Sequence, residues 1–292
     1  FFSPLFVLPR TFQPAGVCHR QLGEVTMDLH RQTSLAIRLL QLGIFLLLTI
    51  WIFGYLGGLS LSPVVHDPAD PSTNDTSALF NWHPLLMMLA FVGCMTEAIM
   101  VYSTAPSSLG YHIPETNRPL KKLVHGVLQC AALLLSVLGI VAAIMSHTLK
   151  EPTPMPNFYS THSALGVLTL VMMVGQGVLG MMAYVAPQWS LHARQAFSPM
   201  HRFFGGATFV VGMATVMVGV QEKTTFLQLV QHPQVRAGIM QIPALLQVCI
   251  AIFMVAVGLR VLVWRLVGAQ GDTSGVSSDG FRVLAEHEIA LD

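Results

Sequence analysis

The chain has 292 residues, of which 53% are hydrophobic and only 10% are charged, and its net charge is +1 with the histidines neutral. Soluble domains carry about 25% charged residues, so this chain lacks the side chains needed to cover a water-facing surface. The near-neutral charge also gives no electrostatic reason to expect nucleic-acid binding. Composition therefore excludes an ordinary soluble domain and predicts a protein that crosses a membrane several times.

Six apolar stretches are long enough to cross a bilayer, which takes about 20 helical residues. They cover residues 37–59, 84–102, 122–145, 159–185, 200–220 and 239–264. We therefore predict an all-α integral membrane protein with six transmembrane helices. The fifth stretch ends at Val220, which leaves Lys223 in the following loop. The expected organisation is a disordered cytosolic extension at 1–34, a membrane domain at 35–265 and a disordered cytosolic tail at 266–292.

Basic residues alternate between the loops, and this predicts the orientation of the helices. The segment at 60–82 contains three aspartates and no Lys or Arg, whereas the next loop contains Arg118, Lys121 and Lys122. Basic residues before the first helix and after the sixth fall on the same side as this second loop. Both termini are therefore expected in the cytosol. A glycosylation sequon at 74–76 lies in a loop placed outside, which agrees with this orientation.

Four histidines lie near the starts of the second to fifth predicted helices: His83, His125, His162 and His201. Ionisable side chains are costly inside a membrane, so four in consecutive helices indicate a function. Successive helices are antiparallel, which places His83 and His162 near the outer face and His125 and His201 near the inner face. At 1.5 Å per residue the two layers should lie roughly 20 Å apart. Two bis-histidine haems need this arrangement, and their filled axial positions suit electron transfer.

An acidic residue interrupts the second apolar stretch. Glu97 lies about 21 Å along the helix from His83 at 1.5 Å per residue, which places it near the inner pair of histidines. We expect a protonated carboxyl with a structural role at this position.

Six short runs resemble the cytochrome b-561 family: FNWHPLLM, TEAIMVYS, LKKLVHGVLQ, NFYSTHSALG, SPMHRFFGG and EKTTFLQ. The resemblance extends from about residue 35 to 265, and all four histidines match the family's haem ligands. It implies that the second to fifth helices form a four-helix core around two non-covalent haem b groups. The implied function is ascorbate-dependent transmembrane oxidoreduction, in which cytosolic ascorbate donates electrons to monodehydroascorbate or a ferric chelate on the other side. A homodimer is implied too, and plasma, vacuolar and endosomal membranes all stay open.

The resemblance also implies substrate and cofactor roles for residues outside the ligand set. They are Lys121, Lys122 and Arg194 for cytosolic ascorbate; His147, Asn157, Phe158 and Tyr159 for the non-cytosolic substrate; and Arg202 and Asn81 for the haems. Ascorbate is a monoanion, so an ammonium group would attract it, and a histidine could exchange a proton with the outer substrate. Membrane-anchoring lysines and an ordinary interfacial histidine are the competing interpretations.

Two other classes of function compete with electron transfer. In a transition-metal transporter the paired histidines would bind Zn²⁺ or Cu²⁺ directly, which calls for further Asp, Glu or Cys ligands at the same depth. Helices two to five offer only Glu97. A structural membrane subunit without redox activity would not need the four-histidine pattern. An absorbance spectrum before and after addition of ascorbate distinguishes all three.

Overall fold

A computed structural model describes residues 15–65, 73–103, 113–114, 116–185, 189–231 and 237–274. Within these ranges six helices are long and apolar enough to cross a membrane, and the only β-pairing is an isolated bridge between Val64 and Asp75. The predicted all-α, six-span fold is therefore confirmed for the part of the chain that the structure describes. The six spans are Arg31–Tyr55, Ser77–Ser103, Arg118–Thr148, Thr161–Tyr184, Leu191–Gln228 and Gln241–Leu262.

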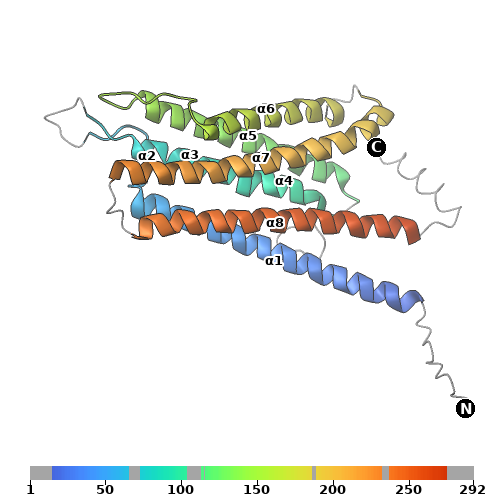
Figure 1. The fold of residues 1–292 in the computed structure, drawn as a ribbon. Coiled ribbons are helices and arrows are strands. Elements are labelled where there is room, and N and C mark those ends of the chain that lie inside the picture. Colours follow the sequence, from blue (N-terminus) through green and yellow to red (C-terminus); the bar gives the residue numbers. More distant parts are fainter. Residues whose placement is uncertain are drawn as a thin grey trace, which may run out of the picture.

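The spans alternate in direction along one bundle. The helices are α1 (Ala15–Tyr55), α2 (Ser77–Phe80), α3 (Trp82–Met88), a π-helix (Leu89–Met95), α4 (Thr96–Met100), a 3-10 turn (Val101–Ser103), α5 (Arg118–Thr148), α6 (Thr161–Tyr184), α7 (Leu191–Gln231) and α8 (Ala237–Ser274). The elements from α2 to the 3-10 turn together make the second span. It packs against α5, and α6 packs against α7, while α1 and α8 pack on each other along one side (Figure 1).

Side-chain caps define where two of the core helices begin. The Asn117 side chain accepts a hydrogen bond from the Leu120 amide before α5, at 3.2 Å. Ser160 caps α6 by accepting from the Ser163 amide at 3.2 Å, and the Ser163 hydroxyl accepts from the Ser160 amide at 3.0 Å. Such caps satisfy amide groups that lack a partner in the first turn of a helix. They fix the entry of the chain into the helices that carry His125 and His162.

Several helices are longer than the apolar stretches that predict them. α1 begins at Ala15, inside the segment expected to be disordered, and α8 continues to Ser274. α7 begins at Leu191 and runs through Pro199 to Gln231, so the placement of Lys223 in a loop is wrong. Hydropathy marks the apolar length that crosses the bilayer, whereas the hydrogen-bonded helix can continue into polar residues beyond it. Residues 1–14 and 275–292 lie outside the described residues, and the boundaries at 35 and 265 stay predictions.

Glu97 forms an ion pair with Arg38 of α1, a charged partner that the expected protonated carboxyl would not need. Arg38 Nη1 contacts Glu97 Oε1, and Nη2 donates to Oε2 at 2.9 Å, so the pair is bidentate. Gln41 Nε2 also donates to Glu97 Oε1 at 3.1 Å and to the Val92 carbonyl at 2.9 Å. This cluster ties α1 to the second span. The structural role agrees with the expectation, but the charged partner was not predictable because the sequence does not reveal which helix faces Glu97.

Candidate functional site

The four histidines form two pairs of facing rings. His83 of α3 faces His162 of α6 with ring centroids 5.8 Å apart and planes at 87°. His125 of α5 faces His201 of α7 at 6.3 Å and 71°. The structure thus brings together the same residues that loop charge and helix direction assign to each pair.

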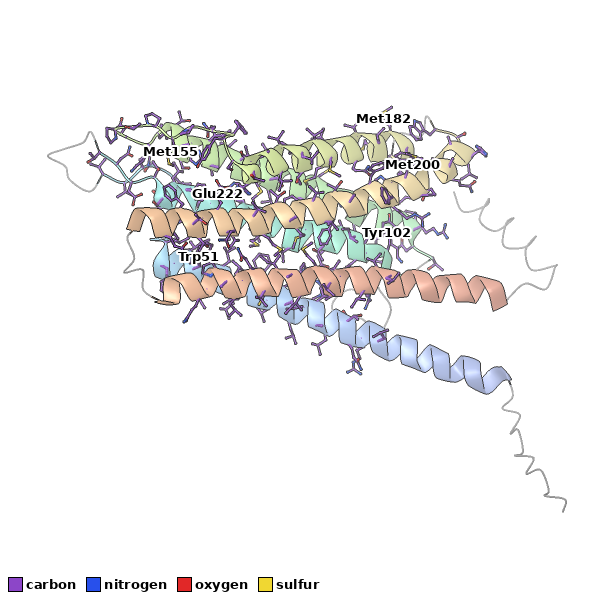
Figure 2. The ribbon with its side chains drawn as sticks, viewed as in Figure 1. Trp51, Tyr102, Met155, Met182, Met200 and Glu222 are labelled. Carbon is purple, nitrogen blue, oxygen red and sulfur yellow. The ribbon has the colours of Figure 1, made fainter. Side chains whose placement is uncertain are left out.

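The two pairs lie toward opposite ends of the bundle. Trp51 and Glu222 line the same cavity as His83 and are found at one end (Figure 2). Tyr102, whose ring centroid lies 5.5 Å from that of His125, is found toward the other end (Figure 2). The bundle therefore holds one histidine pair toward each of its two ends.

Backbone carbonyls orient three of the four imidazoles. The bonds are His83 Nδ1 to Gly139 O (3.0 Å), His125 Nδ1 to Ala98 O (2.7 Å) and His162 Nδ1 to Thr215 O (3.0 Å). A carbonyl oxygen only accepts, so each Nδ1 carries the proton and each Nε2 keeps its lone pair. Metal-ligating histidines commonly have this second bond to a carbonyl. His201 Nδ1 is buried and has no hydrogen-bond partner among the described residues.

The spacing of the rings fits one iron atom in each pair. A metal–imidazole bond of about 2.0 Å places two axial imidazoles roughly 6 Å apart between ring centres. The observed separations are 5.8 Å for the pair that includes His83 and 6.3 Å for the pair that includes His125. Haem iron accepts axial histidine nitrogens in this way. The residues present therefore fit a bis-histidine haem at each end.

Glycines give two of these rings room on the neighbouring helix. A Cβ on Gly219 of α7 would lie 2.6 Å from His162 Cε1, and a Cβ on Gly180 of α6 would lie 3.1 Å from His201 Cε1. Protein interiors are close-packed, so an added methyl at 2.6 Å displaces the ring. Each pair thus depends on a glycine opposite one of its histidines.

We expect Gly219→Ala to lower the haem content of the purified protein, because the new methyl displaces His162 from its bond to Thr215. The haem-to-protein ratio and the visible spectrum measure the loss. Gly258→Ala on α8 is the control, since a Cβ there meets no atom within 4 Å. Equal haem content in the two variants would show that the tight contact at His162 does not matter for binding.

The His83–His162 pair opens into a cavity of about 260 Å³, called here the His83 cavity. The predicted non-cytosolic substrate residues all line it: His147, Asn157, Phe158 and Tyr159. His147 Nδ1 lies 3.0 Å from Asn157 Oδ1, so the amide oxygen accepts from the ring and leaves Nε2 for a ligand. Phe158 has a φ of 58°, a left-handed conformation that is strained for a bulky residue and common at functional sites.

Phe80 connects the substrate residues to the histidine pair. Its ring stacks on His147 with centroids 6.1 Å apart and planes at 3°, and it lies 5.5 Å from the ring of His83. Phe80, Glu222 and Lys223 also line the His83 cavity, although no site role is predicted for any of them from the sequence. The runs FNWHPLLM and EKTTFLQ contain these residues. Glu222 and Lys223 lie beyond Val220, the expected end of the fifth helix, so they were not expected to face the cavity.

The residues predicted to bind cytosolic ascorbate differ in accessibility. Lys121 is 1% exposed, whereas Lys122 is exposed at the start of α5. Arg194 is half-buried on α7, and its Nε is buried without a hydrogen-bond partner among the described residues. It precedes His201 by two helical turns, which places both on one face. Lys122 and Arg194 are therefore the better placed of the three for a soluble anion.

The two residues predicted to contact haem have different surroundings. The Asn81 side chain is fully buried, and its Nδ2 donates to the Leu56 carbonyl at 2.9 Å and the Gly58 carbonyl at 2.7 Å. Its amide nitrogen thus anchors the chain at the end of α1. Arg202 is exposed beside His201, and its Nε donates to the Ser198 carbonyl at 3.3 Å. A haem contact for either residue stays a prediction.

The fold and site define a six-span membrane protein built around two pairs of histidines, each pair spaced to fit one haem iron. The sequence profile of eukaryotic cytochrome b561 matches residues 82–227. The chain is 32% identical over 197 residues to transmembrane ascorbate ferrireductase 2 of Arabidopsis thaliana, covering 68% of this chain and 76% of that protein. The chain belongs to the eukaryotic cytochrome b561 family, and is thus a haem b protein of the membrane.

Two further relatives have similar names. A probable ascorbate-specific transmembrane electron transporter 2 of rice (Oryza sativa subsp. japonica) is 31% identical over 179 residues, covering 61% of this chain and 67% of that protein. A human lysosomal membrane ascorbate-dependent ferrireductase is 34% identical over 153 residues, covering 52% of this chain and 60% of that protein. Every one of these names describes electron transfer or reduction that uses ascorbate.

Proposed function

We propose that this chain is an ascorbate-dependent transmembrane oxidoreductase with two haem b groups, one held by His83 and His162 and the other by His125 and His201. The observation that carries the proposal is a pair of facing imidazoles toward each end of one bundle, each spaced for one iron atom. Bound haem would supply reversible one-electron chemistry, with the two histidines of each pair as its ligands. The names of the relatives support ascorbate as the donor.

The donor side is proposed to be the end that holds His125 and His201. Lys122 and Arg194 supply positive charge near this end and would attract the ascorbate monoanion. Six spans return the chain to its starting side, and the first residues of α1 and the last residues of α8 lie at the same end of the bundle (Figure 1). Both termini are therefore proposed to lie on this side, in the cytosol. The homodimer implied by the family resemblance stays a prediction.

The acceptor side is proposed to be the His83 cavity. Monodehydroascorbate or a ferric chelate would bind there against Phe158 and Tyr159, which are 64% and 63% exposed at the surface. His147 keeps Nε2 available because Nδ1 is bonded to Asn157, so it can exchange a proton with the bound acceptor. The exposed aromatic rings and the half-buried imidazole together offer stacking and proton transfer in one place.

An absorbance spectrum of the detergent-purified full chain tests the proposal. We expect a haem Soret band and a shift to the reduced spectrum when ascorbate is added. A Soret band that ascorbate leaves unchanged would exclude ascorbate as donor. A protein without a Soret band that binds Zn²⁺ would instead support the metal-transporter hypothesis.

The structure weighs against that alternative. The described parts of helices two to five carry two acidic residues: Glu97, which forms an ion pair with Arg38, and Glu222, which accepts a hydrogen bond from Ser160. Among the described residues no group of three or more His, Cys, Asp or Glu side chains could hold a metal ion. Paired histidines alone therefore match haem ligation better than direct binding of Zn²⁺ or Cu²⁺.

We expect Lys122→Gln to slow reduction by ascorbate several-fold at low ionic strength, because Lys122 is an exposed cation at the proposed donor side. Salt screens such attraction over about 8–10 Å, so the difference should shrink at high ionic strength. Stopped-flow reduction measures both effects. An uncharged quinol donor is the control and should show no change. Slowing that is independent of salt, or equal for the quinol, would contradict an electrostatic role for Lys122.

A further inference from the structure

The His83 cavity contains one cationic side chain among its described lining residues, Lys223. Its Nζ lies 4.7 Å from the centroid of the Phe80 ring. Among the described residues it makes no hydrogen bond or ion pair. A cation over an aromatic face gains some stabilisation, but a charged group removed from water is usually paired. Lys223 therefore forms no direct ion pair with a described carboxylate, in a cavity that opens to a ligand.

Two carboxylates, those of Glu222 and Asp75, lie near Lys223, and each accepts a hydrogen bond from another residue. Glu222, its neighbour in the chain, accepts a hydrogen bond from the Ser160 hydroxyl at 3.0 Å, next to the cap of α6. Asp75 accepts from the Ser77 amide at 2.8 Å and lies near enough to Lys223 to attract its charge. Ser160, Glu222 and Trp51 all line the cavity, and Figure 2 shows Glu222 and Trp51 at the same end of the bundle. The ammonium of Lys223 thus remains available to a bound anion.

Phe80 holds the ammonium near the groups proposed to act on the acceptor. The ring that lies under Lys223 also stacks on His147 and adjoins His83. An anionic oxygen that contacts Lys223 would therefore place the rest of its molecule beside the imidazole of His147 and close to the histidine pair. Charge-assisted hydrogen bonds of this type are stronger than neutral ones and orient a ligand.

We propose that Lys223 selects the electron acceptor by its charge and makes the His83 cavity a site for anions with carboxylate or enolate oxygens. This inference rests on the proposed function and extends it. The monodehydroascorbate radical and a carboxylate chelate of ferric iron share that chemistry. A cationic electron acceptor does not. Lys223 is a specificity residue here, because it contacts the acceptor and takes no part in proton exchange.

The experiment uses the haem-loaded full chain, reduced beforehand and mixed with an acceptor in a stopped-flow instrument. Ferric citrate and enzymatically generated monodehydroascorbate are the anionic acceptors, and hexaammineruthenium(III) is the cationic one. Lys223→Gln should raise the apparent KM for the anionic acceptors about tenfold, the effect of losing one hydrogen bond to a charged group. The limiting rate should stay within about twofold, since KM changes alone indicate lost binding.

Three comparisons separate binding by Lys223 from a general defect. Lys223→Arg should restore the KM, because it returns the charge. Lys150→Gln removes an equal charge outside the lining of the cavity and should leave the KM unchanged. Hexaammineruthenium(III) should react with Lys223→Gln at least as well as with the original protein. If the KM rises for only one anion, that anion is the acceptor the site takes. An unchanged KM for both anions, or an equal rise for the cation, would overturn the proposal.

A binding measurement keeps this result separate from failure of the proposed function. Gallium(III) citrate resembles ferric citrate but accepts no electron, and its binding can be followed by titration calorimetry. We expect its dissociation constant to rise about tenfold in Lys223→Gln and to recover in Lys223→Arg. If ascorbate does not reduce the protein, the proposed function fails, yet this titration still tests Lys223. Equal binding of gallium citrate by Lys223→Gln and the original protein would contradict an anion site.

Discussion

Replacing His83 or His162 with alanine is expected to remove about half of the haem absorbance, because each iron needs both imidazoles of its pair. Replacing His125 or His201 should remove the other half. The double variant within a pair should resemble either single variant, whereas one replacement from each pair should leave almost no haem. Pyridine haemochrome assays on equal amounts of purified protein measure these fractions.

The ring separations give this prediction a definite contrary outcome. His83 and His162 are 5.8 Å apart between ring centroids, and His125 and His201 are 6.3 Å apart. If His83→Ala and His125→Ala together lost only half of the haem, these two residues would share one haem and the proposed pairs would be wrong. His192, an exposed histidine of α7, provides the control. His192→Ala should keep the full haem content.

Breaking the ion pair between Arg38 and Glu97 is expected to lower the free energy of unfolding substantially. Removing one partner of a buried pair leaves an uncompensated charge and costs about 3–5 kcal/mol. The side chains of Arg38 and Glu97 are 26% and 18% exposed, so solvent screens the remaining charge and we expect a smaller cost than for a fully buried pair, about 2–3 kcal/mol, for Arg38→Met or Glu97→Gln. Thermal unfolding in detergent, followed by loss of the Soret band, measures the change.

The position of the ion pair predicts which haem leaves first. Ala98 follows Glu97 in the chain, and its carbonyl accepts the hydrogen bond from His125. A loosened second span should therefore release haem from the His125–His201 pair before the other. The variant Arg38→Met with Glu97→Leu leaves no uncompensated charge from this pair and should recover much of the lost stability. Equal destabilisation in the double variant would show that the ion pair is not the cause.

The histidine pairs were predictable from the sequence because the pairing depends only on the depth of each histidine in the membrane. An apolar stretch of about 20 residues crosses the bilayer whatever it packs against, and consecutive crossings must alternate in direction. The position of His125 or His201 along its helix therefore gives its depth. Ring orientation was not predictable, because the carbonyls that bond three of the imidazoles come from other helices.

The ends of the helices were less predictable than their number. α7 continues to Gln231, beyond the expected end at Val220, and this extension carries Lys223 into the His83 cavity. A polar stretch outside the bilayer can be either helical or a loop, because water solvates its side chains in both cases. Hydropathy therefore does not distinguish the two. The cation of the proposed acceptor site was consequently counted among loop charges.

The sequence by itself determined the class of fold, the number of spans and the two depths at which the histidines lie. Bilayer thickness imposes these features on each segment separately, so they can be read along the chain. Only the tertiary structure decided that Arg38 pairs with Glu97, that Phe80 stacks on His147 and that Lys223 lies over Phe80. These contacts join residues from different segments, and they depend on how whole helices pack side by side. Inside a bilayer every span is apolar, so hydropathy carries little information about which faces meet.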